Sequence, residues 1–152
     1  MPERARQRLT ARLRHAGIVV SDLKRAVRFY RAVFGFSVSN EACEAGPFIS
    51  ALVGLRGVRL CWTKLATADG SIVELLEYRS PRPPRPGCPR ADRIGVSHAA
   101  FTVPNLERTC AALLRRGGRV VGTPQTSPDG KVRVVYAHDP DGAILELVQE
   151  LR

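Results

Sequence analysis

The 152-residue sequence contains one pattern twice, and this repeat constrains the fold more than any other feature. The stretch HAGIVVSDL at residues 15–23 matches HAAFTVPNL at residues 98–106. The stretch DGSIVELLEY at residues 69–78 matches DGAILELVQE at residues 141–150. Such a repeat is typical of two copies of one supersecondary unit. The chain is long enough for one ordinary domain or for two small modules that share a core.

The two copies have the same predicted order of elements. Each histidine-bearing stretch has strand composition and is followed by a helix-capping residue, Ser21 or Asp22 in the first copy and Asn105 in the second. Apolar residues then recur at helical spacing until Gly35 and Gly117–Gly118, which end the helices. Three strand-like runs follow in the first copy, at Phe36–Glu44, Phe48–Val53 with Val58–Leu65, and Ser71–Tyr78. Three also follow in the second copy, at Arg119–Val121, Val132–His138 and Ala143–Gln149. Each copy is therefore predicted to be a βαβββ module, which gives an α+β fold.

Charge and proline content set the predicted boundaries. Residues 1–12 form a basic tail, 13–78 the first module, 79–93 a connector rich in proline and arginine, and 94–152 the second module. The tail and the connector carry most of the formal charge of +10, without the aromatic and basic strand pattern of RNA-binding modules. Solvated basic segments are therefore favoured over a nucleic-acid partner.

Membrane and export signals are absent from the sequence pattern. No apolar run approaches the roughly 20 residues that span a bilayer, and the amino terminus lacks the apolar region of a secretory signal. A cytoplasmic protein is expected. The four cysteines, at positions 43, 61, 88 and 110, form no close pair in sequence and are expected to be reduced, mostly buried thiols.

A carboxylate lies in the middle of each final strand. Alternation places Glu74 on one face with Ile72, Leu76 and Tyr78, and the repeat places Glu146 equivalently. An ionised carboxylate on an apolar face is costly unless it is paired or bound to a metal.

The histidines follow the same repeat. Two of the three, His15 and His98, occupy equivalent positions in the two copies. Two nitrogens and two carboxylate oxygens are a suitable ligand set for a divalent transition metal with open positions for water or substrate. The alternative is a pair of hydrogen-bonded histidines with glutamates paired to arginines. The equivalence of all four residues favours the metal.

Two further residues are assigned to structural roles. Glu77 is expected on the face opposite Glu74 as a solvated or salt-bridged residue, because its counterpart is the neutral Gln149. His138, beside the DPDG turn, is expected to face away from Glu146.

These motifs resemble the vicinal oxygen chelate superfamily, which includes glyoxalase I and methylmalonyl-CoA epimerase. The resemblance rests on HAGIVVSDLKRAVRFYRAVFGF, IVELLEY, SHAAFTVPNLE and YAHDPDGAILELVQ, and covers nearly the whole chain after residue 13. It implies two βαβββ modules that curl into an incomplete barrel around one divalent transition metal per site, with nickel, cobalt, manganese, zinc and iron all acceptable. The implied ligands are His15, Glu74, His98 and Glu146. Members are commonly homodimers, and in some the site is completed across the dimer interface.

The resemblance also narrows the expected activity. Extradiol dioxygenases and fosfomycin thiol transferases of this superfamily typically use two His and one Glu, so a fourth ligand favours the glyoxalase and epimerase branches. Bacterial glyoxalase I has an arginine and an asparagine for glutathione where this chain has Val19 and Tyr78, which argues against glutathione.

The expected activity is that of a lyase or isomerase that removes a proton next to the carbonyl of a small oxo, hydroxyacyl or acyl-thioester substrate, with Glu146 or Glu74 as the base. The alternatives are a binding protein that sequesters a metabolite or antibiotic, and, less favoured, an extradiol-type dioxygenase.

Overall fold

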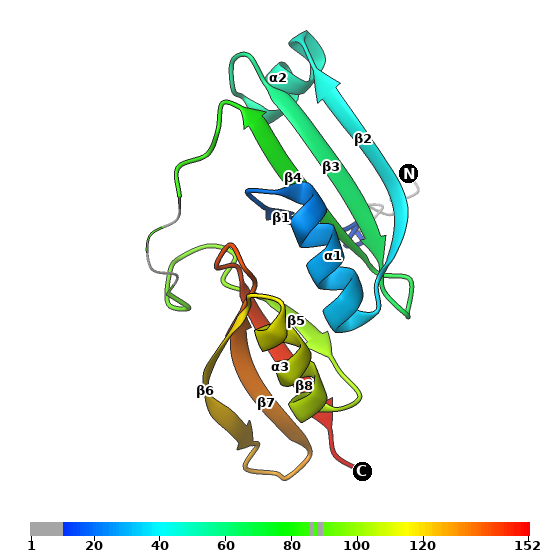
Figure 1. Cartoon of the computed structure of the whole chain (residues 1–152), viewed down its shortest axis with the longest axis vertical. Helices are drawn as coiled ribbons and strands as arrows, with labels where there is room; N and C mark the ends of the chain where they lie inside the picture. The colour runs from blue at the N-terminus through cyan, green and yellow to red at the C-terminus, as the bar shows by residue number, and fades with distance from the viewer. Residues whose placement is uncertain (1–10, 86, 88–89) are drawn as a thin grey trace, which may run out of the picture.

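The computed structural model describes residues 11–85, 87 and 90–152. Most of the predicted basic tail and Cys88 lie outside these residues. The first module contains β1 (Ala16–Val19), α1 (Leu23–Phe34), β2 (Ser37–Ala45), α2 (Pro47–Val53), β3 (Arg59–Ala66) and β4 (Ile72–Ser80) (Figure 1). The second contains β5 (Ala99–Thr102), α3 (Leu106–Arg115), β6 (Arg119–Thr126), β7 (Val132–His138) and β8 (Ile144–Glu150). The described part of the segment between β4 and β5 contains no helix or strand.

Each module forms one four-stranded mixed sheet. The strand orders are β1-β4-β3-β2 and β5-β8-β7-β6, so the first and last strands of each module are neighbours. β1 runs parallel to β4 and β5 runs parallel to β8, whereas the remaining pairs are antiparallel. Both sheets are open, and the described strands form no closed barrel. These sheets and helices confirm the predicted α+β class and the duplicated module.

The two equivalent helices begin and end as their sequences predict. Of the two candidate caps, Asp22 is the one used, and its Oδ1 accepts a hydrogen bond from the Arg25 N–H at 2.8 Å. Asn105 caps α3 in the same way, through a 2.8 Å bond from the Arg108 N–H. Gly35 ends α1 with a φ of 71°, a left-handed conformation that costs glycine little.

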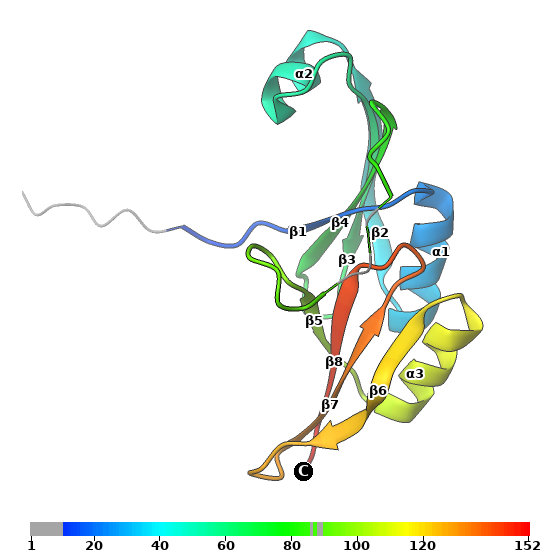
Figure 2. The same ribbon diagram turned by 90° about the vertical axis from the view of Figure 1, so that its left-hand side faces the viewer.

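Helices α1 and α3 lie on the same side of the two sheets (Figure 2). The apolar faces of the helices and the inner residues of the strands form one buried cluster that draws on both modules, including Tyr30, Leu75, Leu106, Leu113 and Leu147. Burial of apolar surface is the main driving force for folding, so this shared cluster fixes the two modules against each other.

A helix replaces one predicted strand. The run Phe48–Val53 was expected to be β-structure, but residues Pro47–Val53 form α2. Pro47 stands at the start of the helix, where its missing N–H costs nothing and its fixed φ suits the helical backbone. Gly54 ends the helix with a φ of 70°. This short apolar run was predicted to be a strand because too few residues are present to show whether the apolar positions repeat with helical or with strand spacing.

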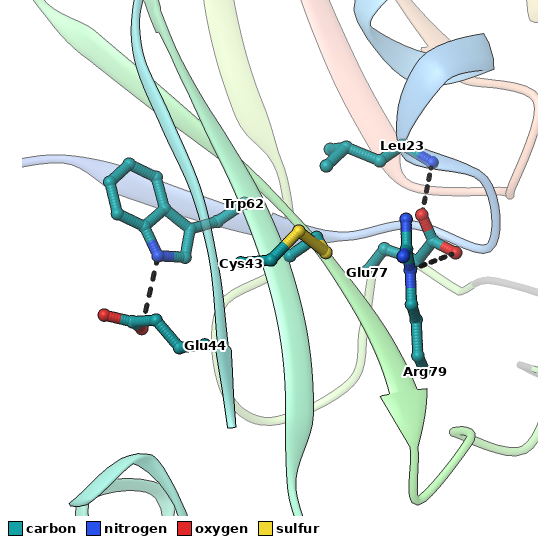
Figure 3. The surroundings of a disulfide bond; sticks show 7 residues. Leu23, Cys43, Glu44, Trp62, Glu77 and Arg79 are labelled. Atoms are coloured by element: carbon teal, nitrogen blue, oxygen red, sulfur yellow. Dashed lines mark hydrogen bonds and ion pairs between the residues drawn. A yellow bond between two sulfur atoms is a disulfide. The ribbon is translucent and has the colours of Figure 1, made fainter. Parts of the chain in front are cut away.

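The expectation of reduced cysteines is also wrong for one pair. Cys43 on β2 and Cys61 on β3 form a disulfide (Figure 3). Their positions are directly opposed in the antiparallel ladder, a register that sequence spacing alone does not reveal. Cys110 is a half-buried free thiol, and burial raises its pKa. No helix in the described part of the chain is long and apolar enough to cross a membrane.

Candidate functional site

The first His–Glu pair forms at the edge of the first sheet. His15 directly precedes β1, and Glu74 lies in the neighbouring parallel strand β4, where it is aligned with Gly17. The His15 Nε2 atom lies 2.9 Å from the Glu74 Oε2 atom. Both side chains are partly buried, at 30% and 13% exposure, so both remain accessible to a ligand.

The second pair repeats this geometry in the second module. His98 directly precedes β5, and Glu146 lies in the parallel strand β8, aligned with Ala100. The His98 Nε2 atom lies 2.8 Å from the Glu146 Oε2 atom. The duplicated sequence therefore places a nitrogen and a carboxylate oxygen side by side twice, through the same pairing of a first strand with a last strand.

Each pair fits two neighbouring ligands of one metal ion. Ligand atoms at about 2.0–2.2 Å from an ion and at right angles to each other are about 3 Å apart. The separations of 2.9 Å and 2.8 Å match that value, and they are also those of a direct hydrogen bond between the two side chains. In addition, the His15 Nδ1 atom is buried without a hydrogen-bond partner in the described structure. The donor chemistry and spacing of each pair thus suit a divalent transition metal.

The two pairs do not meet within one chain. Among residues 11–85, 87 and 90–152, no group of three or more His, Cys, Asp or Glu side chains is close enough to hold one ion. The four predicted ligands are therefore divided into two half-sites, one per module. The four-ligand site that the sequence predicts is therefore not formed within the described residues of one chain.

The sequence analysis missed two residues that lie opposite the carboxylates. Lys64 on β3 is paired in register with Glu74, and its Nζ atom lies 4.0 Å from Glu74 Oε1. Tyr136 on β7 is paired in the same way with Glu146, and its hydroxyl lies 3.4 Å from the Nδ1 atom of His98. A usable signal was present, because residues 67–71 and 139–143 are five-residue turns that contain Asp-Gly and so set the register of each hairpin.

The structural role expected for Glu77 is observed. Its carboxylate forms an ion pair with Arg79 at 3.6 Å and accepts the N–H of Leu23, the first residue of α1, at 3.1 Å. Gln149 accepts the N–H of Leu106, the first residue of α3, at 2.8 Å. Both residues therefore satisfy a free donor at a helix start.

His138 differs from its predicted orientation. It pairs with Ile144, two residues from Glu146, so alternation places it on the same face as Glu146 rather than the opposite face. Its Nδ1 atom lies 2.6 Å from an Arg119 guanidinium nitrogen. Burial, together with the Arg119 charge, lowers the pKa of His138 and favours its neutral form.

The two residues expected at the glutathione-binding positions are placed differently. Val19, at the end of β1, is 48% exposed. Tyr78 packs against the small apolar cluster beneath α2, which contains Ile49, Val58 and Leu60. Neither side chain provides the charged or amide group that an arginine or asparagine would supply.

Comparison with known proteins assigns the family. A sequence profile of the Glyoxalase/Bleomycin resistance protein/Dioxygenase superfamily matches residues 12–147, so the chain belongs to this superfamily. This confirms the vicinal oxygen chelate resemblance seen in the motifs.

Individual relatives lie at low sequence identity. The chain is 27% identical over 139 residues to a probable lactoylglutathione lyase of Synechocystis, covering 90% of this chain and 94% of the relative. A glyoxalase family protein from Bacillus cereus has the same fold, with a TM-score of 0.86, 22% identity and coverage of 99% and 100%. The fosfomycin resistance protein FosX from Listeria monocytogenes also shares the fold, with a TM-score of 0.61, 16% identity and coverage of 94% and 95%.

Proposed function

We propose that the protein is a divalent-metal-dependent lyase or isomerase that removes a proton next to a carbonyl group. The observation that carries the proposal is the pair of matched His–Glu contacts at 2.9 Å and 2.8 Å. Membership of the superfamily and the relative named as a probable lactoylglutathione lyase support this class of reaction. The substrate is a small oxo, hydroxyacyl or acyl-thioester compound.

A second copy of the chain completes the site in this proposal. Exposed apolar side chains provide a surface for it: Leu13, Phe48, Leu52, Ile94 and Val96 are all more than two-thirds exposed. Helix α2, the segment before β5 and residues 11–14 project from the side of the sheets opposite α1 and α3 (Figure 2). Large apolar groups gathered on one side of a protein favour association. A two-fold dimer would bring the first half-site of one copy to the second half-site of its partner.

In this proposal the four predicted site residues serve as metal ligands, and one of the glutamates also serves as the base. His15 and His98 would hold the metal through Nε2 as neutral imidazoles, with Glu74 and Glu146 as the carboxylate ligands. A bound divalent ion would stabilise negative charge that develops on the substrate oxygen.

Glu146 is the better candidate for the base. Glu74 has a cationic neighbour, Lys64 at 4.0 Å, which favours a fixed position for its carboxylate. No lysine or arginine forms an ion pair with Glu146 in the described structure, where its carboxylate contacts His98. Glu146 is therefore freer to leave its ligand position and accept the proton.

Deuterium exchange tests the activity without knowledge of the product. The protein, loaded separately with each candidate metal, is incubated in deuterium oxide with a panel of 2-oxo acids, hydroxyacyl thioesters and branched acyl thioesters. We expect NMR to show metal-dependent loss of the proton next to one carbonyl. Metal-loaded protein that exchanges no member of the panel contradicts this substrate class.

A binding protein that sequesters a metabolite or antibiotic is the second candidate, because the matched superfamily includes bleomycin resistance proteins. Metal content distinguishes the two functions. A protein that only sequesters an apolar compound has no need of two matched His–Glu pairs, whereas the enzyme requires about one ion per four-ligand site.

A further inference from the structure

The Cys43–Cys61 disulfide lies at the surface of an open groove on the α1 side of the first sheet. The groove has a volume of about 540 Å³, and its lining includes both cysteines, Lys24 and Arg28 of α1, and Glu41 and Arg79 of the strands. A smaller depression of about 170 Å³ also borders both cysteines. Figure 3 shows Leu23, Glu77 and Arg79 beside the disulfide.

The groove is separate from the candidate metal half-site. Cys61 is paired in register with Glu77, and Glu77 lies three positions from Glu74 along β4. Because side chains alternate between the faces of a strand, the disulfide and Glu74 lie on opposite faces of the sheet. Chemistry at the disulfide therefore needs no contribution from the metal-binding residues.

The two sulfur-bearing residues differ in access. Cys43 is exposed on the edge strand β2, whereas Cys61 on β3 is only 4% exposed. A thiolate breaks a disulfide by attacking one sulfur, and the sulfur that solvent reaches is attacked more readily. This asymmetry makes Cys43 the point of attack and Cys61 the leaving group.

Cations outnumber carboxylates around the disulfide. Lys24, Arg28 and Arg79 line the groove, and Arg59 lines the smaller depression. The carboxylates on this side are Glu41 and Glu77, the second of which is already bonded to Arg79 and to the start of α1.

One further carboxylate is turned away from the disulfide. Glu44 borders the smaller depression, but its carboxylate accepts a hydrogen bond from Trp62 Nε1 at 3.3 Å (Figure 3). The balance of four cations against three carboxylates, one of them turned away, leaves a positive surplus that attracts anions and stabilises a thiolate.

From this access and charge we propose that Cys43–Cys61 is a thiol–disulfide exchange site for small anionic thiols. In the first step a thiolate attacks Cys43 Sγ and forms a mixed disulfide, the Cys43–Cys61 bond breaks, and its electron pair remains on Cys61 as a thiolate. In the second step another thiolate attacks the small-molecule sulfur of the mixed disulfide and releases Cys43 as a thiolate. Two small thiols are thereby oxidised to one disulfide, and the protein disulfide is reduced to two thiols.

Reduction rates with thiols of different charge test the proposal. The probes are 3-mercaptopropionate, 2-mercaptoethanol and cysteamine, whose second groups are anionic, neutral and cationic. Each rate constant for reduction of the protein is expressed per thiolate. It is then divided by the rate constant for the reaction of the same thiol with bis(2-hydroxyethyl) disulfide, which removes the intrinsic reactivity of the thiol. A net charge of about +1 at roughly 8 Å in water predicts that the anionic thiol is about twofold faster than the neutral one. High salt should remove the difference.

Matched variants separate the local charge from the overall charge of the protein. In Lys24→Gln/Arg28→Gln we expect most of the preference for the anionic thiol to be lost. Arg108→Gln/Arg115→Gln removes the same charge from α3 of the second module and should retain the preference. Equal normalised rates for the three thiols on the wild-type protein, or an equal loss in both double variants, would overturn the proposal.

Peptide mapping tests the order of attack. After brief exposure to 3-mercaptopropionate the protein is alkylated with iodoacetamide and digested with trypsin, which places Cys43 in residues 32–56 and Cys61 in residues 60–64. We expect the mixed disulfide on Cys43 and the alkyl group on Cys61. The reverse distribution, or free thiols at both positions in oxidised protein, contradicts the assignment.

Discussion

The Tyr30 hydroxyl donates a hydrogen bond to the Asp139 Oδ2 atom at 3.0 Å, and this contact joins α1 of the first module to the turn before β8 of the second. Tyr30 is fully buried and Asp139 is 4% exposed. Burial, with Asp139 nearby, raises the pKa of Tyr30 well above its usual value, so the hydroxyl stays protonated. Burial also raises the pKa of Asp139, although its hydrogen bonds from Ala143, Tyr30 and Asp141 oppose that rise.

Tyr30→Phe should destabilise the fold. Removal of the hydroxyl leaves a buried carboxylate oxygen without its donor, which costs about 1–3 kcal/mol of unfolding free energy. Urea denaturation of both proteins measures the difference. Tyr136→Phe is the matched control, because its hydroxyl is 3.4 Å from its partner and only partly buried, and its effect should be much smaller.

The cost of Tyr30→Phe should depend on pH. The folded-state pKa of Asp139 is raised, so its contribution to stability is complete below the ordinary value near 3.8 and is lost as pH rises through the folded pKa. Loss of the Tyr30 bond raises that pKa further. The free-energy difference between wild type and Tyr30→Phe should therefore be larger at about pH 8 than at about pH 4.5. A difference that is constant over this range would show that Asp139 does not titrate as its surroundings indicate.

Removal of either helix-start acceptor should weaken its own module. Glu77→Ala leaves the N–H of Leu23 without its acceptor, and Gln149→Ala does the same at Leu106. We expect each change to cost about 1 kcal/mol of unfolding free energy. Glu150→Ala, at the exposed end of β8, is the control and should be nearly neutral. If neither acceptor variant differs from this control, the two contacts do not stabilise the helices.

Mixed variants should reveal whether the metal site spans two chains. His15→Ala/Glu74→Ala and His98→Ala/Glu146→Ala are each expected to lose metal when purified alone. If the site forms between copies, unfolding and refolding an equal mixture should recover about a quarter of the wild-type metal content, because half of the dimers are mixed and each mixed dimer holds one intact site. Recovery of no metal, with mixed dimers verified by mass spectrometry, excludes a site shared between copies.

The repeat made most of the fold predictable. A match between residues 15–23 and 98–106 fixes which strand begins each module, and the match between the two DG-containing stretches fixes which strand ends it. Capping at Asp22 and Asn105 followed from side chains that accept local backbone hydrogen bonds. These features are local in sequence, so a single chain reveals them.

The features that the sequence analysis missed depend on contacts across strands. The disulfide depends on the register that places Cys43 opposite Cys61. His138 was expected to face away from Glu146, but its strand partner is Ile144, which places it on the same face as Glu146. A shift of one residue reverses the face of every side chain, so the face of His138 follows only when the 139–143 turn is counted residue by residue, whereas no short turn pairs β2 with β3 so directly. The separation of the two His–Glu pairs likewise depends on how the modules pack, which no local pattern specifies.

The difference between Lys64 and Tyr136 should make the two glutamates unequal in catalysis. Glu146→Gln keeps a carboxamide in the ligand position but removes the basic oxygen, so we expect deuterium exchange to fall by about 10²–10⁴-fold with metal still bound. Glu74→Gln should fall by much less, because the Lys64 ammonium at 4.0 Å favours a fixed position for Glu74 rather than the movement that a base needs. Metal content measured on the same samples separates loss of the base from loss of the ion. Wild-type exchange rates in both metal-bound variants would show that neither glutamate moves the proton, whereas a larger loss in Glu74→Gln would reverse their roles.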